Sequence, residues 1–77
     1  MEVSIVKVNG IIWDGEADSV VVPGAEGELT VLPNHVPLVT ALKAGYLVVK
    51  KDGEEVFTDD IERGMLEVTG SRVSILL

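Results

Sequence analysis

The chain has 77 residues, no cysteine, one histidine and a formal net charge of −7. These values exclude disulfides and thiolate or multi-histidine metal sites, and the acidic balance argues against binding to nucleic acid or anionic lipid. No signal-peptide pattern and no apolar run of the ~20 residues of a membrane helix is found, so we expect a soluble, intracellular domain without direct membrane insertion. Because 47% of the residues are hydrophobic, part of this content is expected on the surface as a partner-binding patch.

The N-terminal half predicts short strands separated by turn residues. Residues 1–8 alternate weakly between apolar and polar and precede Asn9-Gly10, a pair typical of two-residue turns. Residues 11–13 begin a second strand, which Asp14-Gly15 is expected to end. Three consecutive valines in residues 19–22 predict a third strand, covered on both faces or lying near a corner of the sheet.

The C-terminal half predicts a meander of hairpins. Asp52-Gly53 is a favoured pair for a type I′ turn, because both residues tolerate positive φ. Gly70-Ser71 predicts the last turn, and Leu38 to Leu42 is the one stretch interpreted as a helical turn. The strands expected here are 46–50, 55–58, 65–68 and 73–77. No linker or repeat interrupts the chain, so residues 1–77 are predicted to form one all-β sandwich domain.

Residues 24–37 stand out because glycines and prolines restrict their backbone. Pro23 to Glu28 predicts a turn, residues 29–32 a short apolar strand, and Pro33 to Pro37 a loop with a proline at each end. A loop that is already rigid loses less entropy when a partner binds it. We expect Glu28 and His35 to lie near one another at one end of the sandwich, either as a contact site or in a purely structural crossover.

The sequence offers no convincing catalytic constellation. His35 is the only histidine, no nucleophile elbow accompanies the serines, and the paired acids lack the spacing of a calcium loop. The domain is therefore predicted to be neither an enzyme nor a cofactor- or metal-binding protein. Two alternatives stay open, a small hydrolase and a β-sandwich module that binds peptides or carbohydrates. The second requires Trp13, Tyr46 or Phe57 to line a groove.

Two long runs carry a resemblance to a known family. Residues 15–29 (GEADSVVVPGAEGEL) and 31–43 (VLPNHVPLVTALK) resemble the N-terminal domain of the ATP synthase epsilon subunit. Residues 64–68 (GMLEV) and 73–76 (VSIL) are similar to the last hairpin of that domain. The likeness spans nearly the whole chain in the right order.

The resemblance implies a flattened β-sandwich of about ten short, mostly antiparallel strands. It implies a non-catalytic rotor subunit of the central stalk, peripheral on the cytoplasmic side of the bacterial inner membrane or in the equivalent organellar compartment. The gamma subunit and the c ring are the partners it implies. Glu28, Asn34, His35 and Val36 are then expected to face the c ring, and Thr40, more weakly, to face gamma.

The chain also departs from the family pattern. The family usually has glycine at the positions of Thr30, Asn34 and Arg63 and alanine at that of Val36; asparagine tolerates the left-handed conformation that glycine adopts. The family normally continues into a two-helix hairpin, whereas this sequence ends at Leu77. The resemblance is therefore to a short form of the subunit, or to a truncated chain, and the sequence leaves both open.

Overall fold

The computed structural model describes residues 1–77 as nine β-strands without a helix. The strands are β1 (Glu2–Lys7), β2 (Gly10–Glu16), β3 (Ser19–Gly24), β4 (Gly27–Val31), β5 (Leu38–Leu42), β6 (Gly45–Lys51), β7 (Glu54–Ile61), β8 (Gly64–Thr69) and β9 (Arg72–Leu76). Valine and isoleucine fill these stretches because β-branched side chains pack well on a pleated surface. The all-β prediction is confirmed, with nine strands in place of about ten.

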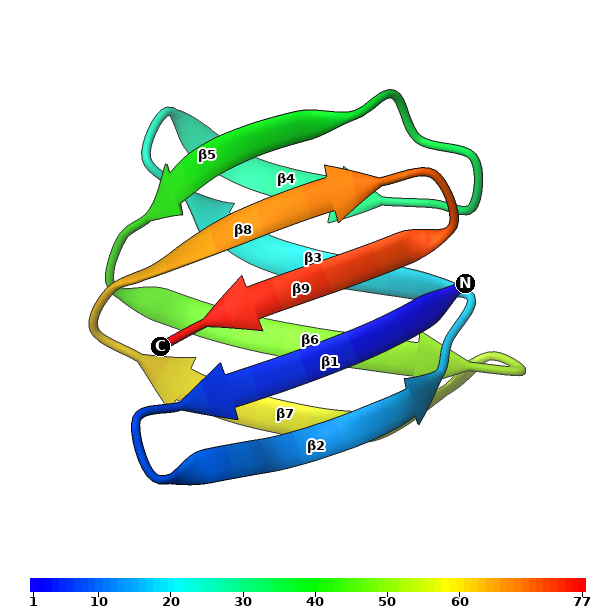
Figure 1. The fold of residues 1–77 in the computed structure, drawn as a ribbon, viewed down its shortest axis with the longest axis horizontal. Helices are drawn as coiled ribbons and strands as arrows, with labels where there is room; N and C mark the ends of the chain where they lie inside the picture. Colours follow the sequence, from blue (N-terminus) through cyan, green and yellow to red (C-terminus); the bar gives the residue numbers. More distant parts are fainter.

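The strands form two layers that face one another (Figure 1). One layer has the order β2-β1-β9-β8-β5, and the other has the order β4-β3-β6-β7. At one corner β5 crosses to the second layer, where Leu42 pairs with Gly24. On the opposite side of the sandwich the Trp13 and Phe57 rings meet with their centroids 6.1 Å apart, which brings β2 against β7.

The predicted meander is present only in part: β6–β7 and β8–β9 pair as antiparallel hairpins, as expected, but β7 and β8 are not neighbours. β1 pairs with β9 in parallel, and β5 with β8 and β3 with β6 pair across long stretches of sequence. The first and last strands thus lie side by side at the centre of one layer (Figure 1). All the other pairs are antiparallel, in agreement with the mostly antiparallel sandwich that was expected.

Three local predictions are wrong. Residues 38–42 form strand β5, not a helical turn, because the alternation of apolar residues there is satisfied by pairing with β8. Asp14 and Gly15 do not end the second strand but continue it to Glu16, opposite Ser4 and Val3. In the same way, the strand expected over residues 55–58 does not end there but continues through Asp59 and Asp60 to Ile61 in β7.

The core is the space between the two layers. It holds fourteen buried residues, all of them apolar: Val3, Ile5, Ala17, Val20, Val22, Val31, Leu42, Leu47, Val49, Ile61, Leu66, Val68, Val73 and Ile75. No polar or charged side chain is buried among them. A dry core of this kind is held by non-directional apolar burial, so it stabilises the sandwich and carries no reactive group.

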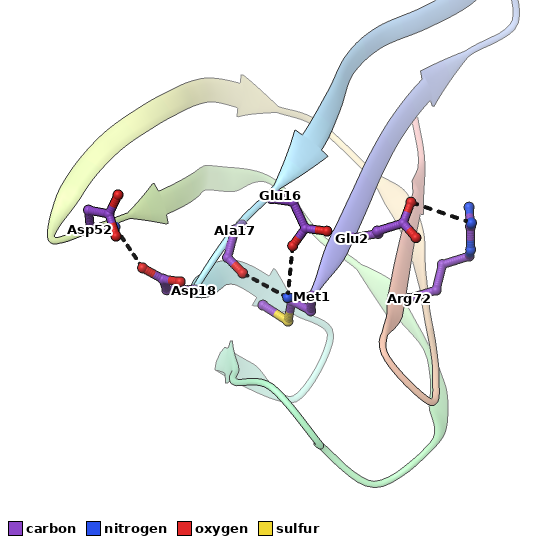
Figure 2. A network of polar contacts seen from close by, with 7 residues as sticks. All are labelled: Met1, Glu2, Glu16, Ala17, Asp18, Asp52 and Arg72. Atoms are coloured by element: carbon purple, nitrogen blue, oxygen red, sulfur yellow. Dashed lines mark hydrogen bonds and ion pairs between the residues drawn. The ribbon is translucent and has the colours of Figure 1, made fainter.

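Polar contacts fasten the strand ends beside the N-terminus (Figure 2). The Met1 ammonium donates to the Ala17 carbonyl at 3.1 Å and pairs with Glu16 at 3.4 Å. The backbone N–H of Asp52 donates to the Asp18 carboxylate at 2.6 Å. This last contact joins the β6–β7 turn to the β2–β3 connection. The turn has the positive φ values predicted for Asp52-Gly53, which are 53° and 79°.

The structure contains no helix that could span a membrane.

Candidate contact site on the β4 edge

A tight β3–β4 hairpin positions Glu28. Gly24 pairs with Gly27 across the turn, and Gly27 has φ 135°, a conformation that L side chains rarely adopt. A Cβ at Gly24 would lie 2.7 Å from the Gly27 carbonyl oxygen, so glycine is needed for this close approach. Glu28 follows opposite Pro23 on the free edge strand β4, with its carboxylate exposed and outside any ion pair within 4.0 Å.

The loop between β4 and β5 is closed by its own backbone. The His35 N–H donates to the Leu32 carbonyl at 3.1 Å, and Asn34 has φ 66°. The left-handed conformation expected of Asn34 is therefore present. The side chain of Val36 is 70% exposed, so this departure from alanine enlarges the apolar surface of the loop.

The ring of His35 is half-buried, and its orientation is fixed locally. Its Nδ1 lies 2.8 Å from the Val36 carbonyl oxygen. Because a carbonyl oxygen only accepts, Nδ1 carries the hydrogen and Nε2 is left as the polar atom for an outside partner. An imidazole held in this way on a closed loop is suited to a defined polar contact.

The structure separates Glu28 from His35. Glu28 lies at the β3–β4 turn, whereas the loop of His35 follows Val31 at the other end of β4 (Figure 1). Three residues of strand alone place about 10 Å between Glu28 and Val31. The expected closeness of the two side chains is wrong, because the strand that the sequence itself predicts between them is extended and holds its two ends apart. They share one edge of the sandwich, and Thr30 is exposed on this edge between them.

Thr40 lies on β5, near the end of this edge that holds Glu28. It is half-buried on β5 and lines, together with Glu28, Leu29 and Leu38, a shallow hollow of about 300 Å³ between β4 and β5. Its hydroxyl contacts only the neighbouring Ala41 carbonyl, at 3.5 Å. Thr40 therefore contributes to the same edge as Glu28.

The polar groups of this edge can make contacts but do not form a reaction centre. His35 and Glu28 are not paired with a nucleophile, and no three His, Asp or Glu side chains gather as a metal site would require. The aromatic residues do not form one groove either. Tyr46 is 67% exposed on β6, while Trp13 and Phe57 pack on each other against the core. This arrangement disfavours the carbohydrate- or peptide-binding alternative.

Solved structures share this architecture. The chain superposes on a subunit from the central stalk and c ring of the Tetrahymena thermophila mitochondrial ATP synthase with a TM-score of 0.83 at 15% identity, covering 99% of this chain and 61% of that one. For a chain of the Euglena gracilis mitochondrial ATP synthase the TM-score is 0.87 at 25% identity, covering 96% and 48%. At 15% identity, the likeness to the Tetrahymena chain shows a shared fold and nothing more.

Sequence relatives give the same family. The chain is 45% identical over 76 residues to the ATP synthase epsilon chain of Leptospira borgpetersenii serovar Hardjo-bovis, covering 99% of this chain and 59% of that protein. It is 46% identical over 72 residues to the epsilon chain of Desulforamulus reducens, covering 94% and 54%. The chain thus spans less than two thirds of these relatives. The family model of the ATP synthase delta/epsilon chain beta-sandwich domain matches residues 1–77, and the chain belongs to this family.

Proposed function

We propose that this domain is a non-catalytic part of the central stalk of a rotary, ion-translocating ATP synthase, where it links the gamma subunit to the c ring. The match of the family model to residues 1–77 carries the proposal. The 45% and 46% identities to the ATP synthase epsilon chains of Leptospira borgpetersenii and Desulforamulus reducens support it. The corresponding location is peripheral, on the cytoplasmic side of the bacterial inner membrane or in the equivalent organellar compartment.

The physical character of the domain supports a mechanical role. Torque is transmitted through packed interfaces, so a rotor part requires stiffness and contact area. The dry core, the paired strands and the closed 32–37 loop supply stiffness. Ten large hydrophobic side chains are also exposed, which agrees with the apolar surface predicted from composition and provides contact area for partners.

The c-ring contact is proposed to lie along the β4 edge. Glu28, Asn34 and Val36 are exposed there, and His35 is half-buried beside them in the loop. A carboxylate and an imidazole can pair with cationic or amide groups of ring loops. Such contacts at the rim of an interface fix its register more than its affinity. Thr40 is the proposed gamma contact on this edge, and it is the weakest member of the set.

The test is reconstitution of the chain with purified gamma subunit and c ring. The double variant Glu28→Ala/His35→Ala is expected to weaken retention on the c ring about tenfold, while thermal unfolding and gamma binding stay as in the wild type. Glu55→Ala is the matched control, because it removes an exposed carboxylate from β7 at the other edge of the same layer. Failure of the wild type to bind either partner would refute the proposed function. If the double variant unfolded, the two residues would be structural.

A further inference from the structure

The turn between β1 and β2 contains Asn9-Gly10, a pair that the proposed function does not use. Val8 and Asn9 form this two-residue turn, and Gly10 begins β2. All three residues are exposed, Val8 by 96%. The Asn9 side chain forms no hydrogen bond with another residue of the chain. Its amide group is therefore open to solvent and held by no contact.

An asparagine followed by glycine is the pair in which a cyclic imide forms with least hindrance, and asparagine is a thermolabile residue. The backbone nitrogen of the second residue attacks the side-chain carbonyl carbon of the asparagine, and a side chain on the second residue crowds this approach. Glycine has no Cβ, so the crowding is absent. The space around Gly10 is also empty, because no atom beyond its chain neighbours lies within 4 Å of the position that a Cβ would take.

The backbone at Gly10 can open at low cost. Gly10 pairs with Lys7 at the last position of the β1–β2 ladder, and both residues are exposed. β2 is an edge strand whose only ladder partner is β1 (Figure 1), and a register shift between Ile5 and Val6 interrupts this ladder. Because such strand ends open locally with little free energy, the Gly10 nitrogen becomes available for attack without unfolding of the core.

The other asparagine of the chain is protected. Asn34 precedes His35, whose side chain crowds the backbone nitrogen, and this nitrogen donates its hydrogen to the Leu32 carbonyl at 3.1 Å. Asn34 is also held at φ 66°, in a loop with prolines at positions 33 and 37. The attack that is open at Asn9 is therefore hindered at Asn34 by a side chain, a hydrogen bond and a rigid backbone.

The two Asp-Gly pairs are slower for chemical and structural reasons. An aspartate side chain at neutral pH is an ionised carboxylate, which is a poor electrophile compared with an amide. Asp14-Gly15 lies inside β2, where the Trp13 ring comes within 3.1 Å of a Cβ built at Gly15. Asp52-Gly53 lies in an exposed turn, but this turn is tied to the β2–β3 connection through the Asp52 N–H. Asn9 is thus the position where imide formation is fastest.

We propose that Asn9 is a site of spontaneous deamidation, at which the β1–β2 turn converts to aspartate and isoaspartate. Base removes the proton of the Gly10 amide, and the nitrogen forms a bond to Cγ of Asn9. The bond between Cγ and Nδ2 breaks, and ammonia leaves with a proton from solvent. Water then opens the five-membered imide at one of its two carbonyls. Water and base are the only co-reactants, so nothing is oxidised or reduced.

The modification changes both the charge and the geometry of the turn. Either product adds one negative charge, beside Lys7, to a chain whose formal net charge is already −7. Isoaspartate also routes the main chain through Cβ and inserts one methylene into a two-residue turn, whose length fixes the register of the hairpin. Because β1 is held by β9 on its other side, we expect the end of β2 to lose its pairing while the core stays folded.

The experiment incubates the folded chain in mildly alkaline buffer and follows both asparagines in the same samples by peptide mass spectrometry. Asn9 is expected to gain about one dalton at least tenfold faster than Asn34. Isoaspartate is identified by its methylation with isoaspartyl methyltransferase. In the modified chain, hydrogen exchange at Ile11 should become faster, while the cooperative thermal unfolding transition is retained.

Two variants test the role of the pair itself. Gly10→Ala crowds the attacking nitrogen and is expected to slow the reaction severalfold. Because alanine is strained at φ 132°, Asn9→Gln is the second variant; it keeps an amide but requires a six-membered ring, so the mass gain at position 9 should disappear. Asn34→Gln is the matched control and should leave the rate at Asn9 unchanged.

Three results would contradict the proposal. An Asn9 that stays intact in the folded chain but reacts once the chain is unfolded in urea would show that the fold protects it. Equal rates at Asn9 and Asn34 in the folded chain would overturn the assignment to the β1–β2 turn. Loss of the cooperative unfolding transition on modification would overturn the confinement of the change to the end of β2.

Discussion

A close approach between Gly45 and Pro23 gives the sharpest test of the packing. Gly45 begins β6 with φ 157°, and a Cβ built there would lie 2.7 Å from the Pro23 Cβ and 3.2 Å from its Cγ. Gly27 is the matched control, because its φ of 135° is also unfavourable for L side chains but no atom lies within 4 Å of a Cβ there. Gly27→Ala thus reports conformational strain alone, whereas Gly45→Ala adds steric overlap.

The expected magnitudes follow from these two terms. An unfavourable backbone conformation costs an L residue about 1–3 kcal/mol of stability. This strain is no larger at Gly45 than at Gly27, because the φ of Gly45 is closer to that of an extended chain. Overpacking against a buried neighbour adds about 1–3 kcal/mol. We therefore expect Gly45→Ala to lower the free energy of unfolding by about 1–3 kcal/mol more than Gly27→Ala. This is a large share of the roughly 4–12 kcal/mol expected for a domain of this size.

Urea denaturation followed by circular dichroism measures both variants against the wild type. The cause is isolated by repeating Gly45→Ala in a Pro23→Gly background, where the opposing Cβ is absent. A double-mutant cycle should then show that the penalty of the alanine falls by at least about 1 kcal/mol. Equal losses for Gly45→Ala and Gly27→Ala, or a penalty that Pro23→Gly does not relieve, would refute the steric argument.

Three further sets of substitutions test the core, the Asp18–Asp52 contact and the Asn34 turn by the same urea denaturation. Leu66→Ala, in the apolar core, should lower the free energy of unfolding by about 2–5 kcal/mol. Leu76 is 54% exposed, so Leu76→Ala should lower it by less than about 1 kcal/mol. Equal losses would place Leu76 in the core. Asp18→Ala removes the acceptor of the Asp52 N–H and should lower the free energy of unfolding by about 1 kcal/mol. Hydrogen exchange of the Asp52 amide should become faster, and unchanged exchange would contradict the contact. Asn34 has φ 66°, a conformation that glycine adopts freely and valine does not. Asn34→Gly should therefore leave the free energy of unfolding nearly unchanged, and Asn34→Val should lower it by about 1–2 kcal/mol. The reverse order would contradict the left-handed conformation.

The β4 edge shows how far local patterns predict a site. The left-handed conformation of Asn34 follows from its residue type, and a closed loop follows from the prolines at positions 33 and 37. The separation of Glu28 from His35 already follows from the strand predicted over residues 29–32, because an extended strand holds its two ends apart, and the expected closeness did not take this into account. The structure pairs residues 29–31 with β3 as part of β4, and the two side chains lie beyond opposite ends of this segment.

By itself, the sequence determined the class of fold, some of the local turns and the two C-terminal hairpins. β-Branched runs favour extended backbone, and Asp52-Gly53 favours positive φ, since both preferences act within a few residues. Which distant strands pair was decided only by the tertiary structure. The parallel β1–β9 pair and the β5–β8 pair join distant segments and bury apolar faces that no short window reveals. The exposed residues Met65, Leu76 and Ile11, for example, come from three different strands, and the strand registers bring them onto one face of a layer.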